Sequence, residues 1–379
     1  MTKETPPGSN SWNPIAPDPG TFTKLCSNIG ANGIQVEQVD LLLDRENLYS
    51  MRPVHGLMIL AKHKPEPISY TMNETTINNS VYFSNQIVHD AYAMHALLNI
   101  LLNCATIDVG KELNNFKQFT HDFTPALKGL TLTNSHVFRQ AYNNLSSSHR
   151  MNQEGDKDIY HPISYIKSGG HLWELDGLKR GPTKLGICDE NNWLDIVHVE
   201  MTKKMEMHNK QRIPATVWAI IEDRRLVYQR RLIGKNYIKR EIECKLDYYQ
   251  PEWRATMDIN QWEEEYRYAM NNERNKRGQI LFTRLVQSYC ESFDQLPPDE
   301  QIGVKSILKE YTKQEDIMDA WLQTQDDSLR LYECLGLEDE KQEMYEKNHI
   351  RRQHDYMPFI HSYIQALFEE GHLQHLVSN

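Results

Sequence analysis

Residues 85–103 carry apolar side chains on nearly every face of the helix that their spacing predicts. A helix that is hydrophobic all round is stable only when it is buried, so this segment must run through the middle of a large core. The polar residues at its start, Asp90 among them, are typical of a helix N-terminus. The chain therefore folds around a central buried helix, which other elements must cover on several sides.

Four short apolar segments have the composition of buried strands, and they lie before and after the central helix in the chain. They are residues 54–60, 159–166, 171–176 and 215–221. The second and third are expected to form a hairpin around Ser168-Gly169-Gly170. Between the first strand and the hairpin, residues 85–103 and 110–144 are expected to be helical. Strands and helices in this irregular order predict an α+β fold with a central antiparallel sheet.

The character of the chain changes after Leu232, where charge density rises and glycine becomes rare. Residues 262–289 and 302–335 are expected to be helical, with a break at Pro297-Pro298. At 379 residues the chain has room for one sizeable domain and an extension. We expect a disordered leader over 1–11, an α+β domain over 12–230, a helical extension over 231–345 and a tail over 346–379.

The tail contains a segment, residues 350–377, that is rich in apolar side chains. Tyr356, Met357, Phe359 and Ile360 lie close together in it, and such aromatic and aliphatic clusters dominate protein interfaces. A short helix of this kind can dock on its own domain or on another protein. The pattern is compatible with both.

The composition of the chain bears on its partners. The 39% hydrophobic and 25% charged residues are typical of a globular protein, and a formal net charge of −10 does not supply the basic face that nonspecific nucleic-acid binding requires. No run of about 18 apolar residues is present to span a membrane. The six cysteines include no CxxC pair, which predicts neither a zinc site nor a disulfide framework and favours a reducing compartment. We expect no cofactor, no nucleic acid and no membrane as partners.

The start of the central helix is where several cysteine hydrolases keep their nucleophile, because the N–H groups and the helix dipole favour the thiolate there. A neighbouring histidine acts as the base and a carboxylate orients it. Eight fragments spread over about 170 residues fit one such family. They are Trp12 with Asp18-Pro19-Gly20, Gly33-Ile34-Gln35-Val36-Glu37, Gln86 with Asp90-Ala91-Tyr92-Ala93-Met94-His95-Ala96, Leu101-Leu102-Asn103-Cys104, Lys128-Gly129-Leu130, Asn134-Ser135, Tyr160-His161 and Glu174-Leu175-Asp176-Gly177-Leu178. In this order they resemble the ubiquitin C-terminal hydrolases, and residues 351–360 are similar to the tail of the proteasome-associated subtype.

The resemblance implies a role for four residues. Gln86 takes the position of the oxyanion-hole amide, which stabilises charge on the attacked carbonyl. His161 takes the position of the general base, and Asp176 that of the residue that orients the base. Tyr92 takes the position of the nucleophilic cysteine.

Tyr92 is a poor replacement for a cysteine. A phenol has an ordinary pKa of about 10, so its anion is scarce near neutrality, and its oxygen lies farther from the backbone than a cysteine sulfur. Cys104 matches an ordinary cysteine of the family and lies about 18 Å away along the helix, at roughly 1.5 Å per residue. Asp90 replaces an asparagine of the family and His95 a glutamine, so the helix start has changed at more than one place.

The leading hypothesis is a catalytically impaired, ubiquitin-binding member of the family. The resemblance implies a role in ubiquitin-dependent protein catabolism in the cytoplasm and nucleus, with a proteasomal adaptor subunit bound through the tail. One alternative is an active cysteine-type deubiquitinase that releases ubiquitin from C-terminal adducts; the other is a structural subunit of a chromatin-remodelling complex. The polar stretch 146–158 ends just before His161, and in the family the equivalent segment crosses over the active site.

Overall fold

The computed structural model describes residues 11–40, 45–63, 81–146, 159–256, 259–285, 292–310 and 316–372. The chain divides into two compact units. Residues up to Ile221 and from Tyr345 onward form the first unit, and Glu222–Met344 form the second. The expected leader up to residue 10, and residues 147–158 of the expected crossover segment, lie outside the described residues.

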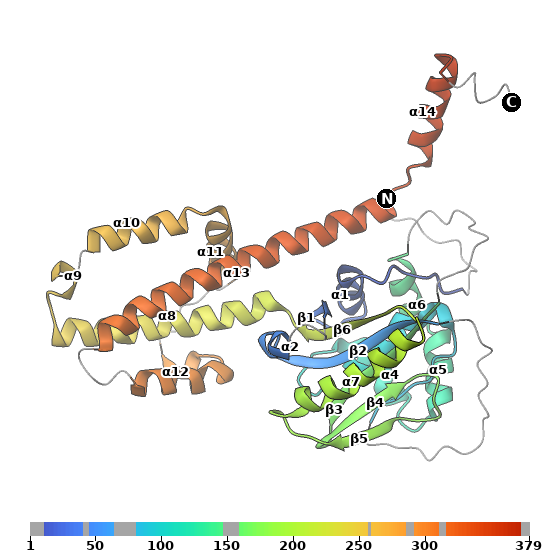
Figure 1. Ribbon diagram of the computed structural model, residues 1–379, viewed down its shortest axis with the longest axis horizontal. Helices are drawn as coiled ribbons and strands as arrows, with labels where there is room; N and C mark the ends of the chain where they lie inside the picture. Colours follow the sequence, from blue (N-terminus) through green and yellow to red (C-terminus); the bar gives the residue numbers. More distant parts are fainter. Residues whose placement is uncertain are drawn as a thin grey trace. The chain divides into compact units, whose positions relative to one another are not determined.

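A six-stranded sheet forms the centre of the first unit (Figure 1). The strands are β1 (Ile34–Val39), β2 (Val54–His63), β3 (Ile159–Ser168), β4 (His171–Asp176), β5 (Thr183–Ile187) and β6 (Ala215–Glu222). They lie in the order β1-β6-β2-β3-β4-β5, and the four pairings from β6 to β5 are antiparallel. This sheet, with its hairpin β3–β4, confirms the α+β prediction, although β1 and β5 are not among the expected strands.

Alternate residues of the strands build two hydrophobic cores, one on each face of the sheet. Leu57 and Ile59 of β2 belong to the core that includes α2 (Arg45–Ser50) and α7 (Trp193–Lys210), and α7 lies across this face in Figure 1. Met58 and Leu60 belong to the other core, which includes α3 (Tyr92–Leu101). Every residue of α3 is buried, so the prediction of a central buried helix is confirmed.

The expected start of the central helix at Asn85 is wrong. Residues 81–88 form neither helix nor strand, and a short 3-10 helix, η1 (His89–Ala91), leads into α3. The backbone N–H of Asn85 donates to the carbonyl of Pro125 and that of Gln86 to the carbonyl of Gly177, both at 3.0 Å. These bonds to distant parts of the chain hold the segment outside the helix, which overrides its local pattern.

The expected helix over 110–144 is divided into three. The three are α4 (Gly110–Phe119), α5 (Pro125–Asn134) and α6 (His136–Asn143). Together with α1 (Pro19–Asn28), they contribute residues to the core around α3. The hydroxyl of Thr124 accepts a hydrogen bond from the N–H of Leu127, and that of Ser135 accepts one from the N–H of Phe138. Both residues are therefore N-caps, and each begins a new helix.

The second unit consists of helices. They are α8 (Arg224–Tyr249), α9 (Trp253–Thr256), α10 (Ile259–Met270), α11 (Glu273–Leu285), η2 (Phe293–Gln295), α12 (Pro298–Glu310) and the first part of α13 (Asp316–Gln353). The rings of Trp253 and Trp321 meet in its core, with centroids 5.4 Å apart. The break expected at Pro297-Pro298 is instead the start of a helix, because α12 begins at Pro298, and a proline at the first helical position leaves no N–H unsatisfied.

Helices α11 and α13 of the second unit cross at two glycines. A methyl group added at Gly278 would clash with the backbone carbonyl of Tyr332, and one added at Gly336 would clash with that of Arg274. Arg277 of α11 also forms ion pairs with Asp339 and Glu343 of α13. The absence of side chains at the two glycines is what allows the backbones to approach this closely.

The last turns of α13 belong to the first unit, where they contact α1. Arg352 donates to the carboxylate of Asp18 and, at 3.0 Å, to the hydroxyl of Thr21. An added Cβ at Gly20 would lie 2.6 Å from the Cγ atom of Tyr345, so the aromatic ring packs directly on this glycine. These two contacts hold the residues at the start of the tail against α1.

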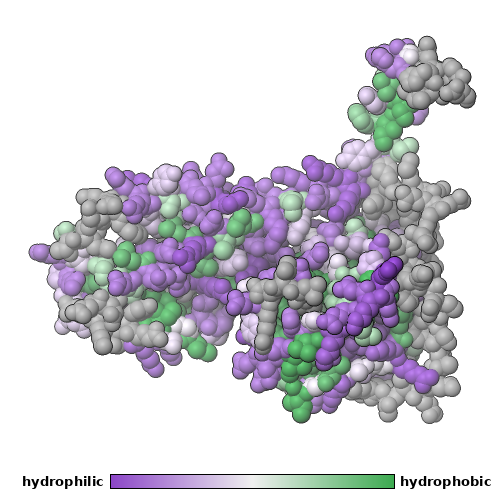
Figure 2. Space-filling model, viewed as in Figure 1, coloured by the Kyte–Doolittle hydropathy of each residue, from purple (hydrophilic) through white to green (hydrophobic). Residues whose placement is uncertain are grey.

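Helix α14 (Met357–Glu369) follows, and none of its residues is buried. Figure 2 shows apolar side chains along it. The described helices include none that is long and apolar enough to cross a membrane.

Candidate active site

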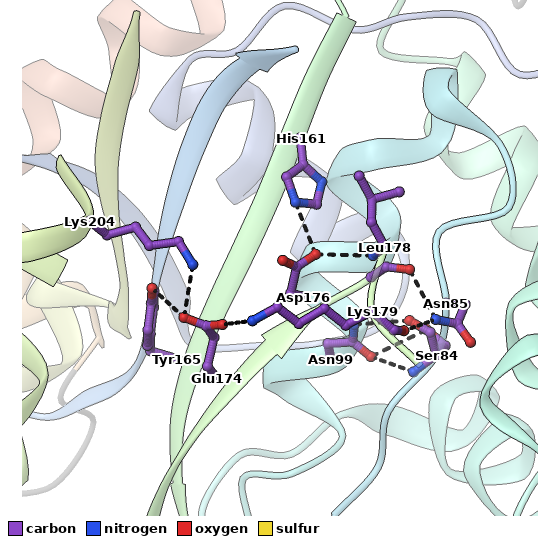
Figure 3. Close-up of polar contacts among 11 residues, drawn as sticks. Ser84, Asn85, Asn99, His161, Tyr165, Glu174, Asp176, Leu178, Lys179 and Lys204 are labelled. Carbon is purple, nitrogen blue, oxygen red and sulfur yellow. Dashed lines mark hydrogen bonds and ion pairs between the residues drawn. The ribbon is translucent and has the colours of Figure 1, made fainter. Parts of the chain in front are cut away.

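His161 and Asp176 form the centre of the site. They lie on the neighbouring strands β3 and β4, and 2.9 Å separates the imidazole Nε2 atom from the carboxylate Oδ1 atom (Figure 3). Burial alone would raise the pKa of the Asp176 carboxyl, but the hydrogen bond and the charge of His161 outweigh it and lower that pKa, with help from the N–H of Leu178. The carboxylate therefore stays ionised and holds the imidazole in a fixed orientation, as a general base requires.

The turn after Asp176 brings Gln86 next to this pair. The carbonyl of Gly177 accepts hydrogen bonds from the backbone N–H of Gln86 and from the side-chain amide of Asn85, both at 3.0 Å. A Cβ added at Gly177 would lie 3.0 Å from the Cβ of Gln86, so the two segments touch. The structure thus brings together three of the four residues singled out from the sequence.

A buried carboxylate, Glu174, lies two residues before Asp176 on β4 and is surrounded by cations. Its oxygens accept hydrogen bonds from Lys179 at 2.6 Å, from Lys204 of α7 at 3.2 Å and from the hydroxyl of Tyr165 at 3.0 Å. Burial raises the pKa of Glu174, but the two lysines outweigh it and lower that pKa. The network anchors β4 to α7 beside the site, and Figure 3 shows it on the opposite side of Asp176 from Asn85.

Tyr92 is the first residue of α3 and is only 2% exposed. Its hydroxyl donates to the backbone carbonyl of Ile15 at 3.1 Å, and its ring packs against those of Phe22 and Tyr160, with centroids 6.2 and 5.3 Å away. Burial, and to a lesser degree the neighbouring Tyr160 and Asp18, raise the pKa of the phenol far above its ordinary value. The side chain is thus a neutral, hydrogen-bonded part of the core.

Tyr92 and His161 are associated with different faces of the sheet. Tyr160, which packs against the Tyr92 ring, belongs to the core around α3. Successive residues of a strand point to opposite faces, so His161 points to the face of Ile163, which belongs to the core around α7. Asp176 pairs with Ile163 across the strands and shares this face.

Four thiols of the described residues are not activated. Burial raises the pKa of Cys26 and of Cys104 to about 12, and it also raises the pKa of Cys188 and Cys334. The thiol of Cys104 donates to the carbonyl of His55 at 3.3 Å. A nucleophilic cysteine needs the opposite shift, toward the thiolate. Cys290 lies outside the described residues.

Sequence reasoning missed two partners of the site, Asn85 and the carbonyl of Ile15. Asn85 stands in the run Ser84-Asn85-Gln86, which is polar and yet buried. A polar run between the apolar residues Phe83 and Ile87 is a signal that could have indicated a role. The carbonyl of Ile15 could not have been found, because a backbone acceptor leaves no trace in the sequence.

Comparisons with known proteins identify the family. A family model described as "Ubiquitin carboxyl-terminal hydrolase, family 1" matches residues 12–206, which include all four of the residues singled out. A second model, described as "Ubiquitin carboxyl-terminal hydrolases", matches residues 330–373 at the end of the chain.

Individual relatives carry the same description. Ubiquitin carboxyl-terminal hydrolase isozyme L5 of Dictyostelium discoideum is 35% identical over 244 residues, which are 63% of this chain and 70% of that protein. Ubiquitin carboxyl-terminal hydrolase calypso of Aedes aegypti is 27% identical over 431 residues, 98% of this chain and 88% of that protein. Among solved structures, Trichinella spiralis UCH37 bound to ubiquitin vinyl methyl ester is 31% identical, with a TM-score of 0.48 over 59% of this chain and 87% of that chain. Since the first family model spans more than half of the 379 residues, the chain belongs to the ubiquitin carboxyl-terminal hydrolase family.

Proposed function

We propose that this chain is a ubiquitin-binding member of its family that has little or no hydrolase activity of its own and acts in ubiquitin-dependent protein catabolism. One observation carries the proposal. Tyr92, at the position of the nucleophilic cysteine in the family pattern, is buried in the core with its hydroxyl donated to Ile15. A phenol whose pKa is raised in this way supplies no anion near neutral pH.

The rest of the site supports binding without cleavage. We assign His161 to the base position, Asp176 to the orienting position and Gln86 to the oxyanion-hole position. These residues are buried and held by hydrogen bonds, so this part of the site keeps its arrangement although the nucleophile is absent. An intact arrangement of this kind is compatible with binding the ubiquitin tail.

The alternative of an active hydrolase requires a thiolate beside His161. The pKa values of Cys26, Cys104, Cys188 and Cys334 are all raised by burial, which favours the inert thiol. This observation favours the impaired enzyme over the active one.

The decisive experiment compares binding and turnover in the same preparation. We expect purified full-length protein to bind ubiquitin in a calorimetric titration while a fluorogenic ubiquitin C-terminal amide stays intact. A ubiquitin probe with a C-terminal thiol trap should form no adduct that survives denaturation. Turnover that His161→Asn abolishes, or an adduct mapped to any cysteine, would show an active hydrolase instead.

We further propose that the tail links the protein to the proteasome through an adaptor subunit. Helix α14 carries large apolar side chains that no part of the described chain buries. They include Met357, Phe359, Ile360, Tyr363, Ile364 and Phe368, and the exposed Tyr356 directly precedes the helix. Apolar side chains of this size are enriched at protein interfaces. Co-purification of proteasomal subunits supports this proposal, whereas co-purification of chromatin-remodelling subunits alone would favour a structural role in such a complex.

A further inference from the structure

The peptide group between Gly177 and Leu178 connects the two halves of the site. Its carbonyl accepts hydrogen bonds from the backbone N–H of Gln86 and from the side chain of Asn85, and its N–H donates to the Oδ1 atom of Asp176, all at 3.0 Å. The carbonyl and the N–H of a trans peptide point in opposite directions, because the group is planar. Any donor that fixes the carbonyl therefore also aims the N–H at Asp176.

Asn85 holds this turn at two points. The two hydrogens of its side-chain amide go to the carbonyls of Gly177 and Lys179, at 3.0 and 2.6 Å, on either side of Leu178 (Figure 3). Asp176 closes the turn, since its own carbonyl accepts from the N–H of Lys179 at 2.9 Å. The turn that follows Asp176 is thus held by hydrogen bonds from Asn85, a residue outside the turn.

Asn85 is itself held in place. It is only 3% exposed, and its backbone N–H donates to the carbonyl of Pro125 at 3.0 Å. Its own carbonyl packs on Gly129 so closely that a methyl group there would clash with it. Helix α5 therefore forms a fixed support, from which the amide reaches the turn.

The position requires a side chain with two hydrogens on one short polar group. An aspartate has the same shape but donates nothing, a serine offers one hydrogen, and an alanine offers none. We propose that Asn85 is a positioning residue, which aligns the Gly177–Leu178 peptide so that Asp176 stays fixed against His161 and Gln86 moves with them as one unit. The catalytic meaning of this unit rests on the function proposed above, but the coupling between Asn85 and Asp176 can be measured without any activity.

The test is the pKa of the Asp176 carboxyl, measured by carbon NMR on the full chain with labelled aspartate and assigned with Asp176→Asn. In the parent this pKa is lowered, in part by the N–H of Leu178. With Asn85→Ala we expect it to rise by up to about one pH unit, which is about a tenfold change in proton affinity, because only the N–H of Gln86 then holds the Gly177 carbonyl and the N–H of Leu178 is aimed less firmly at the carboxylate. Asn85→Ser, which keeps one donor, should give a smaller rise and serves if the alanine variant does not fold.

Asn103→Ala is the matched control. Asn103 also donates its side-chain amide to two carbonyls, those of Tyr82 at 2.8 Å and Asn99 at 2.6 Å, but it does not touch the turn. The Asn103→Ala variant should have a lower melting temperature than the parent and an unchanged pKa of Asp176. If the Asn85 variants behave like this control, Asn85 is only a structural residue and the proposal is overturned. Ubiquitin binding and hydrolysis are not part of this readout, so its failure is distinct from a failure of the proposed function.

Discussion

The hydroxyl of Tyr92 donates to the backbone carbonyl of Ile15 across 3.1 Å, and this bond ties the first turn of α3 to the segment that precedes α1. The segment is held further along by Trp12, whose indole N–H donates to the carbonyl of Thr133 at 3.0 Å. Tyr92 therefore does more than fill the place of a smaller residue. It supplies a contact that a cysteine at this position does not supply.

Removing only this hydroxyl should cost stability without creating activity. For Tyr92→Phe we expect the free energy of unfolding to fall by about 1 kcal/mol, because the carbonyl of Ile15 loses its buried partner. Urea denaturation measures the change. Tyr268→Phe, at a tyrosine that is 84% exposed, is the control and should leave the midpoint unaltered. A Tyr92→Phe variant as stable as the parent would mean that the bond does not form in solution.

Restoring the cysteine should restore part of the chemistry. Tyr92→Cys places a thiol in the first turn of α3, beside Tyr160, the neighbour of His161 in β3. Because His161 points to the other face of the sheet, its side chain must turn toward the thiol to act as the base, with Asp176 as the orienting group and Gln86 as the oxyanion donor. We expect slow hydrolysis of a fluorogenic ubiquitin amide, and a loss of stability on the order of a few kcal/mol from the cavity. The rate should rise further when Asp90→Asn is added, because Asp90 puts a like charge beside the thiolate.

His161→Asn in the Tyr92→Cys background is the control for that rescue and should abolish the activity. If the double and single variants fold and bind ubiquitin yet remain inert, the base and oxyanion assignments are wrong. The chain would then have lost the base and the oxyanion donor as well as the nucleophile.

The pH dependence of stability should reveal His95. Neither ring nitrogen of this buried residue has a hydrogen-bond partner among the described residues, and burial lowers its pKa from 6.5 to about 3. In the unfolded chain the His95 imidazole binds a proton below about pH 6.5, whereas in the folded chain it stays neutral until about pH 3. His95 therefore weakens the fold progressively as the pH falls through this window, by up to about 1.4 kcal/mol per pH unit.

His95→Leu should remove that loss, so that the free energy of unfolding falls less steeply between pH 6.5 and 4 than in the parent. It should also raise stability at pH 7.5 by about 1–3 kcal/mol, because no unsatisfied polar group remains. Exposed His136→Leu on α6 is the comparison and should leave the slope unchanged. Equal slopes for His95→Leu and the parent would show that water or another group satisfies the ring.

The glycines at the crossing of α11 and α13 should not tolerate a methyl group. In an exposed helix interior, alanine in place of glycine adds up to about 1 kcal/mol of stability. We expect that gain for Gly303→Ala on α12, where an added Cβ meets no atom within 4 Å. Gly278→Ala and Gly336→Ala should instead lose about 1–3 kcal/mol, because the backbones must move apart. Guanidinium denaturation followed by circular dichroism separates the two outcomes, and a stabilised Gly278→Ala would contradict the close crossing.

Two truncations should separate partner binding from folding. Stopping after residue 354 removes α14 but keeps Arg352 and its bonds to Asp18 and Thr21. We expect this variant to lose binding to the proposed proteasomal adaptor in a pull-down while its melting temperature stays that of the parent. Phe359→Asp, at a side chain that is 67% exposed, should weaken the same interaction in the full chain. Stopping after residue 345 also removes the bonds of Arg352 to Asp18 and Thr21 and should lower the melting temperature. Retained adaptor binding after either truncation would move the docking site to the helices of the second unit.

The strands of the sheet interior were predictable because each carries its own signal. The hairpin of β3 and β4 has apolar residues on both sides of Gly169-Gly170, and this local pattern suffices. The edge strand β5 is half exposed and has no apolar run, so nothing in residues 183–187 distinguishes it from a loop. Its existence depends on pairing with β4, which a local pattern does not contain.

The residues of the candidate site also include some that the sequence indicates and some that depend on distant parts of the chain. The positions assigned to His161, Asp176, Gln86 and Tyr92 were implied by the resemblance of the surrounding fragments to the family, and the structure brings the first three together. The polar run around Asn85 marks it as a candidate, but its acceptors could not be predicted, because Gly177 and Lys179 are 92 and 94 residues away in sequence. The late start of the helix, at Tyr92 instead of Asn85, has the same cause, since long-range hydrogen bonds decide the conformation of residues 84–86.

The bond between Asp18 and Arg352 also bears on how the protein is synthesised. The chain leaves the first unit after Ile221 and returns to it only at Tyr345. A ribosome adds about 5–20 residues per second, so roughly 7–26 s pass between the last strand of the sheet and the arrival of Arg352. During that interval the N-terminal helix is already made, but the residues that pack on Gly20 and bind Asp18 are not. The first unit is therefore completed last, after the inserted helices have been translated, and a nascent chain stalled within them exposes the face of α1 that the end of α13 later covers.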